Sequence, residues 1–185
     1  GEAAVAAPEK RYGFLAVCAG EGLEAVFRDL TVDRIVSGGQ TMNPSTEAIL
    51  QEVNRTPSEI VFILPNNKNI IMAAQQVDAL TPKTVVVIPS KTVPQGITAM
   101  MNVDPEAEVA SITEAMTEAL STVTTSQITY AARDSEFECV ELSSEAVTHR
   151  LVSTETTKKN YPFNFELLVT HRLTENHISV EWTVK

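Results

Sequence analysis

The sequence predicts a layered α/β domain with a parallel sheet and flanking helices, followed by an antiparallel β-hairpin. Two observations predict the domain: short apolar runs alternate with amphipathic segments, and the runs are rich in β-branched residues without polar alternation. A third predicts the hairpin, because two β-rich stretches near the end of the chain have no helical segment between them.

The expected elements follow one another in a regular order. Strands are expected at 14–18, 34–36, 59–64, 84–88 and 127–132, and helices at about 23–30, 44–53, 68–80 and 106–120. Parallel strands are buried on both faces, so runs such as 85–88 favour a parallel sheet with right-handed crossovers. Residues 163–170 and 177–184 form the expected hairpin, with its turn at 174–176.

Composition narrows the function classes. The 185 residues are 43% hydrophobic, and 14 basic against 24 acidic residues give a formal charge of −10. This charge argues against nucleic-acid binding, which depends on neutralising phosphates. No apolar run reaches 18 residues, so no membrane span is expected. Two cysteines are too few for a disulfide scaffold or a zinc site, so we expect a cytoplasmic protein in which Cys18 is a buried apolar residue.

Charge and residue usage change near Ser143. All seven glycines and the whole net charge precede this residue, whereas all three histidines follow it. We therefore predict a linker or cut end at 1–11, an α/β domain at 12–142 and a β-rich tail of different origin at 143–185. If the hairpin does not pair with the α/β core, its free edges favour a homodimer.

Three strand-to-helix loops are unusually polar, and parallel strands place such loops along one edge of the sheet. They are either well-capped helix starts or a shared binding site. Asn43 is the expected cap of the second helix, with Pro44 at the first helical position. The candidate ligand- or partner-binding residues are Gly38, Gly39, Gln40, Thr41, Asn43, Ser45, Asn66, Asn67, Lys68, Asn69, Ser90, Lys91, Thr92 and Gln95.

These loops favour binding over catalysis. The α/β domain has no histidine, no P-loop and no G-x-S-x-G sequence, so no catalytic residue and no metal ligand is proposed. The acidic residues of the 106–120 segment, such as Glu114 and Glu118, are expected to form a solvated helix face.

Four segments carry a resemblance to a known family: GGQTMNPSTEAI (38–49), LPNNKNIIMAA (64–74), VVVIPSKTVPQG (85–96) and ITYAARDS (128–135). Over about residues 12–142 the chain resembles the C-terminal, DegV-like region of the bacterial DAK2-containing fatty acid kinase subunit, which is also known as a dihydroxyacetone-kinase-like protein. The order and spacing of the segments are specific to that family.

The resemblance implies a non-catalytic docking domain of a kinase. In that family, ATP and magnesium bind a separate kinase domain, so we expect no cofactor in this chain. The implied partner is a DegV-type fatty-acid-binding protein, and an acidic docking surface would suit a basic patch on it. The alternative is a fatty acid or small-anion binding module, since DegV-like proteins hold a carboxylate with the matching loops. Here Asn66 and Asn67 replace serines of that pattern.

The tail departs from that family. Residues 161–185 (YPFNFELLVTHRLTENHISVEWTVK) resemble a strand pair of the galactose mutarotase family. The catalytic His and Glu motif of the mutarotases has no match here, so we do not expect sugar epimerisation. A recombined gene, or an engineered or misassembled chain, would explain the change in composition.

Overall fold

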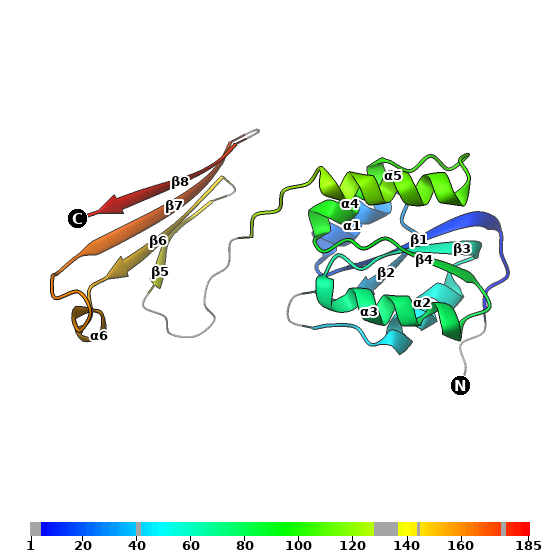
Figure 1. Ribbon diagram of the computed structural model, residues 1–185, viewed down its shortest axis with the longest axis horizontal. Coiled ribbons are helices and arrows are strands. Elements are labelled where there is room, and N and C mark those ends of the chain that lie inside the picture. Colours follow the sequence, from blue (N-terminus) through cyan, green and yellow to red (C-terminus); the bar gives the residue numbers. More distant parts are fainter. Residues whose placement is uncertain (1–4, 40–41, 128–136, 144, 175–176) are drawn as a thin grey trace. The chain divides into compact units, whose positions relative to one another are not determined.

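The computed structural model describes residues 5–39, 42–127, 137–143, 145–174 and 177–185 (Figure 1). The chain divides into two compact units, Gly1–Ser126 and Gln127–Lys185. This division falls earlier than the composition predicts. The reason is strand pairing: Phe137–Leu142, assigned above to the α/β domain, is hydrogen-bonded to a strand of the second unit.

The first unit is built on a four-stranded parallel sheet, as predicted. Its strands are β1 (Lys10–Cys18), β2 (Arg34–Ser37), β3 (Ser58–Leu64) and β4 (Thr84–Val87), in the order β2-β1-β3-β4. β1 and β3 occupy the centre, and their side chains are buried on both faces. This explains why their sequences show continuous apolar runs.

Helices cover both faces of this sheet (Figure 1). On one face, α1 (Glu21–Asp29), α4 (Val93–Met101) and α5 (Val109–Ser121) pack around Phe14 and Phe62, whose rings stack at 5.3 Å. On the other, α2 (Thr46–Arg55) and α3 (Lys68–Gln76) pack on Leu15 and Ile63. The short 3-10 helix η1 (Asp78–Leu80) follows α3, so the single helix predicted at 68–80 is interrupted.

Three local predictions differ from the structure. Ser45, not Asn43, caps α2, because the Ser45 hydroxyl accepts a hydrogen bond from the Ala48 N–H at 3.1 Å. Helix α4 was not predicted, since its first turn lies in a stretch rich in turn formers. Residues 6–11 are no linker: the Ala6 N–H donates to the Asn54 carbonyl at 2.7 Å, and β1 begins at Lys10.

The second unit is a four-stranded antiparallel sheet in the order β5-β6-β7-β8. Its elements are β5 (Phe137–Leu142), β6 (Ala146–Val152), the short helix α6 (Glu155–Lys158), β7 (Glu166–Thr174) and β8 (His177–Val184). The predicted hairpin is confirmed, since β7 pairs with β8 and Thr174 lies opposite His177. β5, β6 and α6 were not predicted, and the strand expected at 127–132 lies almost wholly outside the described residues.

Candidate functional site: the carboxyl edge of the parallel sheet

The polar loops after β2, β3 and β4 meet at the carboxyl edge of the parallel sheet. We call these loops, residues 38–45, 65–67 and 88–92, together with the first turns of α3 and α4, the rim. Of the predicted site residues, Gln40 and Thr41 lie outside the described residues. The others belong to the rim, and several of them are in direct contact.

Asn66 is the centre of the rim. Its side chain is 7% exposed, and its Nδ2 donates to the carbonyl of Val17 in β1 at 3.0 Å. The hydroxyl of Ser90 donates to Asn66 Oδ1 at 2.8 Å and accepts from the Asn66 N–H at 3.0 Å. A φ of 54° places Asn66 in the left-handed region, which asparagine tolerates better than most residues. One amide therefore joins the ends of three neighbouring strands.

Gly96 makes this arrangement possible. A Cβ atom at Gly96 would lie 2.0 Å from Asn66 Oδ1 and 2.8 Å from its Cγ. Any side chain at this position of α4 would displace the buried amide. Glycine at 96 thus serves close packing of α4 against the loop after β3.

Asn67 connects the second loop to the first. Its Oδ1 caps α3 by accepting from the Asn69 N–H at 2.9 Å, and its Nδ2 lies 3.4 Å from the carbonyl of Gly39. Gly38 has no room for a side chain, because a Cβ there would lie 2.6 Å from Pro44 Cδ. The asparagines predicted as ligand donors are therefore engaged in holding loops together.

Gln95 connects the third loop to α5. Its Oε1 accepts from the Lys91 N–H at 2.7 Å, and its Nε2 donates to the Leu120 carbonyl at 3.2 Å. Thr92 caps α4 and its hydroxyl lies 2.8 Å from that of Thr125. The C-terminal end of α5 is thereby fixed beside the rim.

The side chains that remain exposed on the rim are chemically mixed. Met42 is 67% exposed, and Asn43, Lys68, Asn69 and Lys91 are also exposed. The first turns of α1 and α2 add acidic residues at the same edge, namely Glu21, Glu24 and Glu47. The rim is consequently of mixed charge, not uniformly acidic, and it presents a methionine that can adapt to different surfaces.

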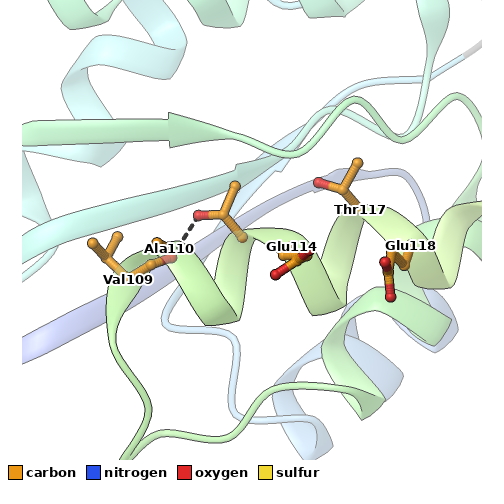
Figure 2. Close-up of a pocket in the computed structure, with 6 residues that line it drawn as sticks. Val109, Ala110, Glu114, Thr117 and Glu118 are labelled. Carbon is orange, nitrogen blue, oxygen red and sulfur yellow. Dashed lines mark hydrogen bonds between the residues drawn. The ribbon is translucent and has the colours of Figure 1, made fainter.

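A shallow hollow of about 550 Å³ lies elsewhere, on the outer face of α5 (Figure 2). Val109, Ala110 and Thr113 line one end of it, and the Thr113 hydroxyl donates to the Val109 carbonyl at 2.7 Å. Glu114 and Glu118 line the other end and are exposed, as predicted for a solvated helix face. All lining residues come from one helix, so this surface does not enclose a ligand.

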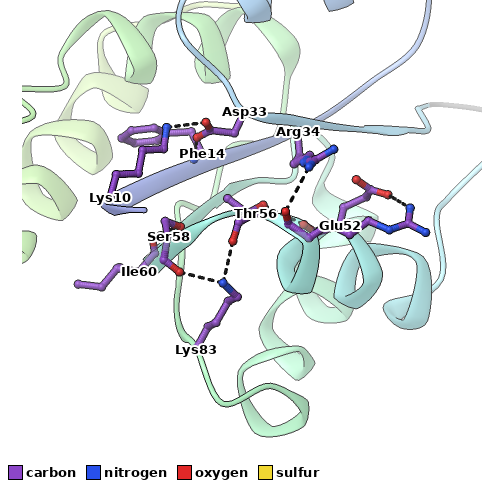
Figure 3. Close-up of polar contacts among 10 residues, drawn as sticks. Lys10, Phe14, Asp33, Arg34, Glu52, Thr56, Ser58, Ile60 and Lys83 are labelled. Carbon is purple, nitrogen blue, oxygen red and sulfur yellow. Dashed lines mark hydrogen bonds and ion pairs between the residues drawn. The ribbon is translucent and has the colours of Figure 1, made fainter. Parts of the chain in front are cut away.

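The amino edge of the sheet holds a buried cation (Figure 3). Lys83 Nζ donates to the carbonyls of Ala6, Thr56 and Ser58 at 3.1, 2.7 and 2.9 Å. Burial lowers the pKa of Lys83. Because three carbonyls occupy its three N–H donors, we interpret Lys83 as a structural residue that anchors the N-terminal segment.

Two further features concern chemistry. Cys18 is 2% exposed, and burial raises the pKa of its thiol to about 11, which confirms the prediction of a small core residue. Within the described ranges, no group of three or more His, Cys, Asp or Glu side chains could hold a metal ion. Over the same ranges, the helices are too short or too polar to cross a bilayer.

Comparison with known proteins agrees with the sequence resemblance. Residues 13–147 match the family of FakA-like C-terminal domains, which belong to fatty acid kinases. Protein YloV of Bacillus subtilis is 42% identical over 127 residues, which are 69% of this chain and 23% of YloV. Uncharacterized proteins of Staphylococcus saprophyticus and Staphylococcus aureus are 39% and 38% identical over 132 residues. The matched residues are 71% of this chain and 24% of each of those proteins, so the chain spans about a quarter of the length of these relatives.

Proposed function

Since the chain belongs to the family of FakA-like C-terminal domains of fatty acid kinases, we propose that its first unit is a docking domain whose rim binds a DegV-type fatty-acid-binding protein. ATP and magnesium would bind elsewhere in the longer kinase protein. On this proposal the chain contributes recognition to a cytoplasmic phosphotransferase and performs no catalytic step by itself.

The contacts of Asn66 carry the proposal. A buried amide that joins three loops fixes the shape of the rim before a partner arrives. Ordering loops on association lowers affinity, so a surface that is already ordered gives tighter and more specific binding. Gln95 and Asn67 extend the same network, whereas Met42, Lys68 and Lys91 remain free to contact a partner.

The carrier alternative has less support. It requires donors that can reach an anion, yet Asn66 and Asn67 already have partners within the unit. Mass spectrometry of the natively purified chain distinguishes the two hypotheses: a carrier retains an acyl chain or anion, and a docking domain does not.

Titration calorimetry with a DegV-type fatty-acid-binding protein tests the docking function. Met42 and Met101 form a matched pair, because they are 67% and 70% exposed but lie at different edges of the first unit. Met42 belongs to the rim, and Met101 is the last residue of α4, which runs away from the rim. We expect Met42→Ala to weaken binding by at least about 5-fold, since truncation of a central contact costs ~1 kcal/mol or more.

Met101→Ala should leave the affinity unchanged. Binding that is insensitive to Met42→Ala, or no binding at low salt, contradicts the proposal. Because the rim carries charges of both signs, we expect only a modest loss of affinity between low and high salt.

A further inference from the structure

The sheet of the second unit has two chemically different faces. Residues paired directly across antiparallel strands lie on the same face, so the register places Val180 beside His171 and Val147, and Trp182 beside Val169 and His149. We call this side the apolar face. Its exposed large side chains are Leu142, Leu173, Ile178, Val180, Trp182 and Val184, which are between 47% and 76% exposed.

The opposite face is polar and internally paired. Arg150 Nε donates to Glu166 Oε1 at 2.7 Å, and Lys185 Nζ lies 3.7 Å from the other carboxylate oxygen. The hydroxyls of Thr148 and Thr170 are 2.9 Å apart. A sheet with one such face is normally covered on its apolar side by a second layer.

The open area of the apolar face matches that of a protein interface. Six large side chains at these exposures leave roughly 700 Å² of apolar surface in contact with water, taking about 150–250 Å² for a whole aromatic side chain. The largest apolar patch of a typical monomer is about 300–600 Å², whereas each partner of a stable complex buries about 800 Å².

An unpartnered polar atom also points to a covering layer. His171 Nδ1 is shielded from water and has no hydrogen-bond partner, and the His171 ring contacts that of His149 with centroids 6.3 Å apart. Buried polar atoms nearly always have a partner, so we expect whatever covers this face to supply one.

We propose that the apolar face binds the same face of a second copy of this chain, so that two sheets pack face to face about a two-fold axis. A nearly flat apolar sheet is complementary to itself, which a two-fold interface requires. The exposed apolar side chains of the first unit offer no equivalent surface, because they are spread over separate elements, such as Met42 in a loop, Met72 in α3 and Met101 in α4.

The test compares two neighbouring positions of β8 by sedimentation velocity of the full chain over a range of concentrations. Val180 lies on the apolar face, and Ser179 lies on the polar face opposite Arg172. We expect the native chain and Ser179→Glu to sediment as dimers. Val180→Glu should sediment with half that mass, since an unpaired buried carboxylate raises the dimer dissociation constant on the order of 100-fold or more.

Fluorescence of Trp182, the single tryptophan, gives a second measurement that needs no variant. On dilution of the native chain, its emission should shift to longer wavelength and acrylamide quenching should increase as the dimer dissociates. Three results overturn the proposal: a native chain that stays monomeric at every concentration, a Val180→Glu chain that remains dimeric, or a Trp182 signal that is protected at all dilutions. The last result would mean that the first unit of the same chain covers the face.

Discussion

Replacing Gly96 by alanine tests the packing at the centre of the rim. The added Cβ would lie 2.0 Å from Asn66 Oδ1, far inside van der Waals contact. Asn66 cannot rotate away without breaking its hydrogen bonds to Val17 and Ser90. The substitution must therefore shift α4 or detach the buried amide.

The expected magnitude follows from opposing effects. Overpacking a closed site costs ~1–3 kcal/mol, and leaving a buried amide unpaired costs ~1–3 kcal/mol more. Alanine favours a helix over glycine by ~1 kcal/mol, which offsets part of the loss. We expect Gly96→Ala to lower the free energy of unfolding of the first unit by about 3 kcal/mol, which for a unit of this size lowers the midpoint temperature by about 10 °C.

Far-UV circular dichroism is a suitable assay, because helices α1 to α5 all lie in the first unit. Gly22→Ala is the matched control, since Gly22 is also in a helix but nothing lies within 4 Å of the position that an added Cβ would occupy. This control should be neutral or stabilising by up to ~1 kcal/mol. Both variants therefore make the same chemical change in helices that differ in their surroundings.

A double-mutant cycle isolates the proposed contact. Asn66→Gly keeps the left-handed backbone available and removes the amide that the new Cβ would meet. In that background, Gly96→Ala should cost much less than it does alone, giving a coupling free energy of at least ~1 kcal/mol. If Gly96→Ala proves as stable as Gly22→Ala, or if the two effects are additive, the described packing of Asn66 is wrong.

Three further predictions concern single side chains. Lys83→Met should destabilise the first unit by ~2–3 kcal/mol in urea denaturation, because three buried carbonyls lose their donor; an unchanged midpoint would refute its anchoring role. In a Cys139→Ser background, Cys18 should react with a thiol reagent at pH 8 only after denaturation, since burial raises its pKa to about 11; rapid reaction of the native chain would contradict this. The hydrogen bond from Arg150 lowers the pKa of Glu166, so this pair should stabilise the second unit above the usual glutamate range and lose that effect as the pH falls through the lowered pKa; Glu166→Gln should flatten this dependence of tryptophan fluorescence on pH.

The sequence predicts the parallel sheet well because its signal is local. Runs such as residues 59–64 are almost wholly apolar, which a strand buried on both faces requires. Helix α4 escapes prediction because Pro94 and Gly96 usually mark turns. In the structure, Pro94 lies in the first turn, where no N–H is needed, and Gly96 is set by the distant Asn66.

The candidate site is predictable in position but not in detail. Polar residues after successive parallel strands must gather at one edge, and residues 66, 67 and 90 do so. Which amides are exposed and which are buried depends on backbone conformation and on partners far along the chain, such as Val17 for Asn66. β5 and β6 were missed for a similar reason, since their pairing is defined by one another and not by a local pattern.

Hydrogen exchange of the full chain, with and without a DegV-type fatty-acid-binding protein, tests the docking function most directly. Slower exchange on binding should be confined to the rim, in peptides that cover residues 38–45, 65–72 and 88–96. Protection that falls instead on the outer face of α5 or on β8, or no protection at saturating partner, would contradict the assignment of the rim as the docking surface.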